Sequence, residues 1–239
     1  MREPIPLSAL ASTLGLDHEH GHHHLAIVGG GGKTTLLHAL GVQLPGRVVM
    51  TCTTKMGHDQ HRGASVLLAP ADDEVVAAAD RGRVMVWERI VGQKAVGVDP
   101  DACDRWFPLV DHVIAEADGS RQRPFKAPAQ FAPVVGATTT LMLSVIGADA
   151  LGRVIADQCH RPLRVAALAG CQPYQRLTPE AAARVLLHPR GARKALPGEA
   201  RLAVIITKVD DRSANLVGDL VAALSAHDPS VPAVMIGYE

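Results

Sequence analysis

Aromatic residues, paired cysteines and long hydrophobic runs are all scarce in this chain of 239 residues. Only 3 % of the residues are aromatic while 47 % are hydrophobic, which predicts a core rich in Ala and Val. The four cysteines form no CxxC pair and no dense framework, which excludes a disulfide scaffold and favours a reduced cytoplasm. No apolar run approaches the roughly 18 residues of a membrane helix, and prolines interrupt the N-terminus where a signal peptide is apolar. We therefore expect a cytoplasmic protein with no membrane partner.

Net charge is also missing, because 24 basic side chains balance 24 acidic ones. This balance argues against a surface that binds nucleic acid. The ordinary globular composition, with 20 % charged residues, excludes a disordered or fibrous protein. The length corresponds to between one and two domains of about 150 residues. Composition does not determine the oligomeric state, and a homodimer is one of the possibilities.

Short Val, Ile and Leu runs alternate with amphipathic segments, a pattern typical of βαβ units around a mostly parallel sheet. We expect strands at residues 25–28, 47–51, 84–87, 111–115, 140–146, 202–206 and 233–236. Helices are expected from Lys33, Asp72, Pro100 and Pro179, and around residues 216–224. The sequence predicts one α/β domain over residues 25–239, preceded by an N-terminal segment at 1–24, with a small helical insertion at about 150–195.

The strongest motif joins the first strand to the first helix, and it consists of Gly29, Gly30, Gly31, Gly32, Lys33, Thr34 and Thr35. Glycine lets backbone N–H groups approach phosphates closely, the lysine adds charge, and Thr34 offers a hydroxyl to Mg²⁺. Ile27 stands where the P-loop pattern has its first glycine, and the alternative is a flexible glycine turn. We predict a P-loop NTPase-like fold that binds GTP or ATP with Mg²⁺.

A second motif, Glu116-Ala117-Asp118-Gly119, follows a buried strand. The carboxyl ends of parallel strands form the ligand crevice of α/β sheets, and residues two apart project from the same side of an extended segment. We predict that Thr34 and Asp118 hold Mg²⁺ and that Glu116 or Asp118 orients an attacking water, with Lys33 on the terminal phosphates. The alternative is a strand-end turn with solvated acids.

A third motif, Thr207-Lys208-Val209-Asp210, follows a late buried strand and is similar to the [NT]KxD base motif of GTPases. A carboxylate such as Asp210 accepts from both N1–H and N2–H₂ of guanine, which adenine cannot offer, while the Lys208 stem packs along the base. The motif favours GTP over ATP, although a surface Lys-Asp pair has the same appearance.

Three further groups stay open between function and simple solvation. Five histidines, His18, His20, His22, His23 and His24, form either a metal-binding cluster or a solvated lead-in to the first strand. The basic residues are anion contacts or solvated loop residues: Arg121, Arg123 and Lys126, and later Arg190, Arg193 and Lys194. The segment Thr51-Cys52-Thr53-Thr54-Lys55 either directs its hydroxyls and lysine toward phosphate or only reflects the preference of threonine for strands.

Several segments together resemble the YqeC family of selenium-dependent hydroxylase accessory proteins: VGGGGKTTLL, TCTTKM, EADGSRQRPFKAP, CHRP, LTPEAAARVLLHPRGARKALP and ITKVD. The resemblance runs from about Leu25 to the end of the chain. It implies a P-loop nucleotide-binding protein that takes part in the maturation of selenium-containing molybdenum hydroxylases. Thr207 departs from the usual Asn, and Ser120 from a common Ala. The residues that it implies for the site are 29–35, Glu116, Asp118, Lys126, Thr207, Lys208 and Asp210.

The preferred hypothesis is an Mg²⁺-dependent NTP hydrolase that favours GTP and partners a selenium-dependent molybdenum hydroxylase or its maturation factors. One alternative is a metallochaperone GTPase that binds Ni²⁺ or Zn²⁺ through the histidine-rich segment. Another is a small-molecule kinase or nucleotidyl-transfer enzyme that uses the same glycine loop and requires an acceptor.

Overall fold

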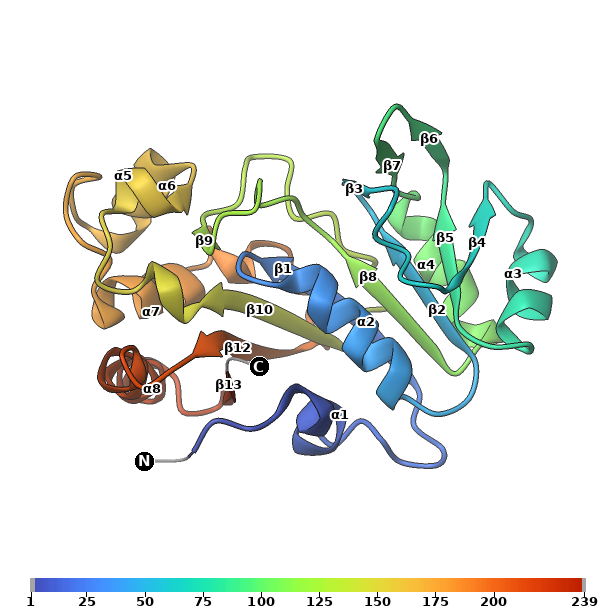
Figure 1. The fold of residues 1–239 in the computed structure, drawn as a ribbon, viewed down its shortest axis with the longest axis horizontal. Helices are drawn as coiled ribbons and strands as arrows, with labels where there is room; N and C mark the ends of the chain where they lie inside the picture. The colour runs from blue at the N-terminus through green and yellow to red at the C-terminus, as the bar shows by residue number, and fades with distance from the viewer. Residues whose placement is uncertain (1–2, 238–239) are drawn as a thin grey trace.

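The chain folds around an eight-stranded sheet in which every pair of neighbouring strands is parallel. The structure is a computed structural model that describes residues 3–237. The strand order is β13-β12-β10-β1-β8-β2-β5-β4 (Figure 1). The strands are β1 (His23–Gly29), β2 (Val48–Cys52), β4 (Ser65–Leu68), β5 (Val84–Trp87), β8 (His112–Glu116), β10 (Leu141–Gly147), β12 (Arg201–Val209) and β13 (Ala233–Gly237). The expected α/β class with a mostly parallel sheet is confirmed.

Helices cover both faces of this sheet. Leu25 and Ile27 of β1 pack with α2 (Lys33–Gln43) and with the N-terminal η1 (Leu7–Ala9) and α1 (Leu10–Thr13). The alternate residues of the strands face the opposite layer, because successive side chains of a strand point to opposite sides. That layer contains α3 (Asp72–Ala79), α4 (Pro100–Trp106), α7 (Pro179–Leu187) and α8 (Ala214–His227). Figure 1 shows α2 in front of the sheet, with α3 and α4 toward one end and α7 and α8 toward the other.

Two small sheets and several short helices complete the described chain. An antiparallel sheet contains β3 (Lys55–Gly57), β6 (Arg89–Val91) and β7 (Lys94–Val96). A two-stranded parallel sheet joins β9 (Phe125–Lys126) to β11 (Cys159–His160). The remaining helices are η2 (Phe107–Leu109), η3 (Ala148–Ala150), α5 (Ile155–Gln158), α6 (Pro162–Ala169) and η4 (Ala192–Ala195). Among residues 3–237, no helix combines the length and the apolarity that crossing a bilayer would require.

The predicted helix starts follow their capping chemistry. Asp99 accepts a hydrogen bond from the N–H of Asp101 at 3.0 Å, with Pro100 as the first residue of α4. Thr178 accepts one from Ala181 at 3.1 Å at the start of α7. Both caps satisfy backbone donors that a helix leaves unpaired, and proline needs no such partner.

The N-terminal segment is more ordered than the sequence indicates. The boundary expected at residue 24 falls inside β1, which begins at His23, and His24 is fully buried. Leu10 and Leu16 are fully buried against the α2 layer, and Ile5 forms a parallel bridge with Ile236 of β13. Of the histidines expected in a solvated lead-in, His18, His20 and His22 are exposed, whereas His24 is buried. The apolar residues that precede them cover one face of the sheet.

At the end of β1, the chain connections on the two sides of the strand run toward opposite edges of the sheet. β1 lies between β8 and β10, and the chain continues from β1 to β2 on one side and from β10 to β12 on the other. Such a switch point opens a crevice at the carboxyl ends of the strands, where α/β sheets bind their ligands. The glycine loop, residues 29–32, lies at this point.

Candidate functional site

The glycine loop is shaped so that only glycine fits. Gly29, Gly31 and Gly32 have φ of 99°, 86° and 119°, which side chains rarely tolerate. A Cβ on Gly29, Gly30 or Gly31 would lie less than 3.0 Å from the backbone of Val145, Arg123 or Gly147, respectively. Helix α2 begins directly after the loop, and no side chain caps its N-terminus. The first turn of α2 therefore presents backbone N–H donors beside a loop with no side chains in the way.

Lys33, the first residue of α2, lies among oxygen atoms. Its side chain is 3 % exposed, and Nζ donates to the carbonyl of Gly29 at 2.9 Å. The same Nζ lies 3.5 Å from Glu116 Oε1 and 3.4 Å from Asp118 Oδ1. The prediction that the two acids share one side of the strand end is confirmed, because both reach one ammonium group.

Glu116, at the end of β8, also contacts the residue after Lys33. The Thr34 hydroxyl donates to Glu116 Oε2 at 2.8 Å, and the Glu116 side chain is 9 % exposed. A hydroxyl and a carboxylate side by side are the oxygen ligands that Mg²⁺ takes when phosphates complete its coordination. The residues present therefore fit a magnesium ion at Thr34 and Glu116. The sequence had paired Thr34 with Asp118 instead.

Asp118 has a different set of partners. Its carboxylate accepts from the N–H of Gly29, at 3.1 Å to each oxygen, and forms an ion pair with Lys126 Nζ at 2.8 Å. Lys126, on β9, is 5 % exposed and also donates to the carbonyl of Gly119 at 2.7 Å. Burial lowers the pKa of Lys126, and the nearby Asp118 opposes that shift. These contacts make Asp118 the anchor that joins the start of the glycine loop to β9.

The third motif borders a cavity beside the glycine loop. This cavity of about 290 Å³ is lined by Leu7, Gly31, Gly32, Thr35, Leu36, Thr207, Lys208, Ile236 and Gly237. The register between β12 and β13 shifts between Ile206 and Val209, and Lys208 has a left-handed φ of 59°. Irregularities of this kind re-aim side chains beside functional sites. Here Thr207 lies against the loop, where its hydroxyl donates to the carbonyl of Gly31, and Lys208 lines the cavity.

Two members of the third motif make contacts away from the glycine loop. Lys208 Nζ forms an ion pair with Asp149 at 2.7 Å. The Asp210 carboxylate accepts from the N–H of Ser213 at 2.9 Å and from its hydroxyl at 2.7 Å, in the turn before α8. Asp210 is exposed and does not line the cavity. Base recognition by Asp210 therefore stays a prediction that requires its carboxylate to turn from Ser213.

Several other candidate residues have structural partners. The Thr51 hydroxyl donates to the carbonyl of Val86 at 2.7 Å, and that of Thr53 to Val134 at 2.6 Å. Arg193 forms an ion pair with Asp228. Lys194 donates to the carbonyls of Ala129 and Ala132, at 2.7 Å and 3.2 Å. These contacts leave Thr51, Thr53, Arg193 and Lys194 as scaffold residues.

The histidines do not converge on a common point. His22 stacks on Phe107 with ring centroids 4.0 Å apart, while His23 stacks on His112 of the neighbouring strand at 5.3 Å. Burial lowers the pKa of both His24 and His112 to about 4. Within residues 3–237, no three His, Cys, Asp or Glu side chains are placed to share a metal ion. The histidine-rich metallochaperone hypothesis thus gains no support from the geometry.

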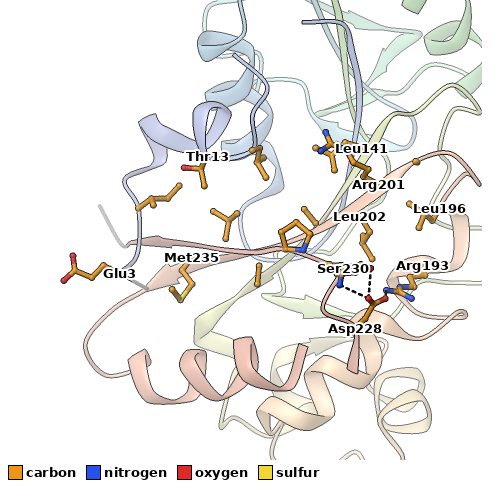
Figure 2. Close-up of a pocket in the computed structure, with 18 residues that line it drawn as sticks. Glu3, Thr13, Leu141, Arg193, Leu196, Arg201, Leu202, Asp228, Ser230 and Met235 are labelled. Carbon is orange, nitrogen blue, oxygen red and sulfur yellow. Dashed lines mark hydrogen bonds and ion pairs between the residues drawn. The ribbon is translucent and has the colours of Figure 1, made fainter. Parts of the chain in front are cut away.

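A larger cavity lies at the opposite end of the strands. Its volume is about 640 Å³, and Leu141, Arg201 and Leu202 line it at the beginnings of β10 and β12 (Figure 2). Figure 2 shows its polar side occupied by Asp228, which accepts from Ser230 and pairs with Arg193. Because Asp228 is already bound to Ser230 and Arg193, the glycine loop is the better candidate for chemistry.

Comparison with known proteins identifies the family of the chain. Residues 25–163 match the sequence model of the YqeC protein family, a range that contains the glycine loop, Glu116, Asp118 and Lys126. The chain is 30 % identical over 225 residues to a protein of Escherichia coli (strain K12) named "Uncharacterized protein YqeC". That alignment covers 89 % of this chain and 86 % of the relative. No solved structure matches the chain.

Proposed function

The chain belongs to the YqeC family, and from this premise we propose that it binds a nucleoside triphosphate with Mg²⁺ and hydrolyses it. The observation that carries the proposal is the position of Lys33. Its ammonium group lies between Gly29 O, Glu116 and Asp118, directly at the start of a helix that follows a side-chain-free loop. On binding, terminal phosphate oxygens would replace some of these oxygen atoms as charge-assisted partners of the same ammonium group.

The residues around the loop divide the work in this proposal. The N–H groups of residues 31–35 cradle the phosphates, because those of Gly29 and Gly30 already bind Asp118 and Val145, and Lys33 contacts the terminal phosphates. Thr34 and Glu116 hold Mg²⁺, which neutralises charge on the phosphate oxygens. Glu116, which accepts a hydrogen bond from Thr34, would also orient the attacking water. Asp118 keeps Lys33 and the loop in place, and Lys126 supports Asp118.

For the base, we propose guanine in preference to adenine. The cavity beside Gly31 and Gly32 continues from the phosphate loop toward Thr207 and Lys208, which is where a base attached to bound phosphates would lie. The preference itself is supported by the Thr207-Lys208-Val209-Asp210 sequence. Thr207 bonds to the carbonyl of Gly31, so that base-side and phosphate-side segments are directly linked.

For the cellular role, we propose an accessory factor for a selenium-dependent molybdenum hydroxylase, on the strength of the family resemblance. Loops that are ordered by a terminal phosphate and released by its hydrolysis couple NTP turnover to partner binding. Copurification of the chain with such a hydroxylase, in a manner that depends on the bound nucleotide, would support this role. Copurification to the same extent with and without bound nucleotide would contradict this role.

Replacing Lys33 tests the nucleotide proposal. We expect the unmodified chain to bind GTP, and ATP more weakly, with an affinity that rises when Mg²⁺ is added. Lys33→Ala removes the ammonium group from the phosphates, so nucleotide binding should be lost. Isothermal titration calorimetry with GTP and ATP, with and without Mg²⁺, measures both effects.

A matched lysine provides the control for this experiment. Lys94 lies exposed on β7 in the separate antiparallel sheet, and Lys94→Ala should bind nucleotide as the unmodified chain does. Circular dichroism checks that Lys33→Ala retains its fold, since the change leaves two carboxylates with less counter-charge. Unchanged GTP affinity in folded Lys33→Ala would overturn the proposal.

A further inference from the structure

A cationic cluster lies beside the glycine loop and is not used by the proposed nucleotide contacts. It is defined by Arg121, Arg161 and Arg164, with the neutral His160 between Arg161 and Lys126. The parallel pairing of β9 with β11 sets His160 opposite Lys126. The segment before β9 rests on the site, because Gly147 N–H donates to Pro124 O at 2.9 Å and the Arg123 carbonyl covers Gly30. The cluster therefore adjoins the place proposed for the terminal phosphate.

The positive charge of this cluster is not neutralised within the described chain. Across residues 3–237, Arg121, Arg161 and Arg164 form no ion pair with a carboxylate. Asp118 is the acid that acts on Arg161, but it is already bound to Lys126 at 2.8 Å and to Lys33 at 3.4 Å. By contrast, Arg193 and Lys194, which the sequence also offered as anion contacts, have partners within the fold.

The cluster is partly buried on one side only, because Arg121 and Arg164 are exposed. Arg161 and His160 are half-buried, and a guanidinium nitrogen of Arg161 lies 3.4 Å from His160 Nδ1. Burial, reinforced by Arg161, Lys126 and Arg121, lowers the pKa of His160 to about 4. His160 is consequently neutral near pH 7, and its ring already bonds to the Gly119 backbone and contacts Arg161, so that it positions Arg161 without adding to the repulsion among the cations.

The backbone supplies an independent observation. Arg121, Gln122 and Arg161 have left-handed φ of 52°, 62° and 61°. Long side chains rarely adopt this conformation, and such residues gather at ligand-binding sites, where the surrounding structure maintains them. Two of these three residues, Arg121 and Arg161, are arginines without an ion pair. They belong to two segments of the chain that the pairing of β9 with β11 holds together.

We propose that Arg121 and Arg161, the latter held by His160, bind a phosphate group, free or carried by a small organic molecule, as a second ligand beside the nucleotide. Arg guanidinium groups match phosphate oxygens with paired hydrogen bonds, which a compact ammonium group cannot do. The position next to the terminal phosphate deepens the proposed function by identifying the chemical class of a co-substrate or effector. The position of the anion beside a terminal phosphate rests on the proposed nucleotide binding. The contacts of the arginines with the anion do not depend on it.

Titration of inorganic phosphate into the full-length chain tests the site in two arrangements. In the first, the glycine loop is saturated with Mg²⁺ and a non-hydrolysable GTP analogue, so that added phosphate must bind elsewhere. In the second, Lys33→Ala without nucleotide replaces the unmodified chain. Methyl phosphate is titrated in parallel, because tighter binding than inorganic phosphate identifies a phosphomonoester and weaker binding a free oxyanion.

Removal of the two unpaired arginines should weaken phosphate binding by about tenfold or more in both arrangements, since two charge-assisted contacts are lost. The variant is Arg121→Gln with Arg161→Gln, and its fold is checked by thermal unfolding. Arg83→Gln is the matched control, because Arg83 is exposed just before β5, the strand next to the β4 edge of the main sheet. This control should leave phosphate affinity unchanged.

Two results would overturn the second site: equal phosphate affinity with and without the two arginines, or no phosphate binding by either parent chain. Failure of the GTP analogue to bind would contradict the proposed function instead. In that event the Lys33→Ala arrangement still decides the anion site, so the two failures are distinguishable.

Discussion

Two acids that stand two residues apart in the sequence have unequal environments in the fold. Glu116 contacts Thr34 and Lys33, whereas Asp118 holds Gly29, Lys33 and Lys126. Buried ion pairs add little net stability, because the loss of hydration offsets their attraction. Two buried lysines and two buried acids at one strand end are therefore better explained by chemistry than by stability. The strand-end position indicated a functional acid, but only the contacts separate the two roles.

Asp210 offers a test of base choice at a single residue. If its carboxylate binds guanine, Asp210→Ala should weaken GTP binding by roughly tenfold or more, since a bidentate base contact contributes about 1–3 kcal/mol of discrimination. ATP affinity should not change, because adenine lacks the donors that a carboxylate accepts. Calorimetric titration of both nucleotides measures the ratio of affinities.

Asp211 is the matched control for this change, because it is an exposed neighbour with no hydrogen bond to Ser213. Asp211→Ala should leave the GTP-to-ATP ratio as it is. The contrary outcome is a lower melting temperature in Asp210→Ala with the same GTP-to-ATP ratio. That result would reduce Asp210 to a residue that fixes the turn before α8 through its bonds to Ser213.

At the scale of elements, buried histidines in β1 and β8 give the central strands an unusual composition. His23 pairs with His112 in register, and His24 follows with no exposed surface. His24 Nδ1 lies 2.9 Å from the Thr138 hydroxyl and 3.8 Å from Asp104. Burial is the main reason for the low pKa of His24 and of His112, both about 4. Near neutral pH, the folded chain therefore contains His24 and His112 in their neutral forms.

This composition predicts that stability falls as the pH drops from about 6.5 toward 4. The unfolded chain takes up protons near the ordinary histidine pKa, whereas folded His24 and His112 do not until about pH 4. The free energy of unfolding should therefore rise with pH across this window, by about 1.4 kcal/mol per pH unit for each histidine. Urea unfolding at several pH values measures the slope.

His112→Phe keeps a ring beside His23 and removes one titrating group, so it should reduce that slope. His20→Phe is the control, because His20 is exposed and its replacement should leave the slope unchanged. Paired acids such as Asp104, whose pKa is lowered, affect the pH dependence of stability only below about pH 4, the pKa of an acid in the unfolded chain. A slope that is identical in His112→Phe and in the unmodified chain would contradict the assignment to buried histidine.

The elements that the sequence predicted are those with continuous apolar runs or capping residues. β1, α2 and β8 carry such signals, and so the glycine loop and both acids could be located in advance. The three-residue strands β3, β6 and β7 are too short for a periodic pattern. The pairing of β9 with β11 rests on two residues in each, far apart in sequence. Arg161 and Lys126 were consequently not recognised as neighbours.

At the scale of the whole molecule, the N-terminal segment belongs to the folded layer that covers α2. The N–H of Ala11 donates to Gln43 Oε1 at 2.8 Å, and Gln43 Nε2 donates to the carbonyl of Leu7 at 2.9 Å. The segment also meets the far edge of the sheet, where Ile5 N–H donates to Met235 O at 2.8 Å. Its polar, histidine-rich composition near residue 20 concealed this packing, because no long apolar run marks it.

Leu10→Ala tests whether the N-terminal segment stabilises the whole domain. Leu10 is fully buried, so the substitution should lower the free energy of unfolding by about 2–5 kcal/mol through the cavity it leaves. Leu163→Ala, at a position 73 % exposed, should change it by no more than about 0.5 kcal/mol. Both variants should bind nucleotide normally while folded, because neither side chain lines the glycine loop cavity. Equal stability of the two variants, measured by urea unfolding, would show that the segment is a detachable lead-in after all.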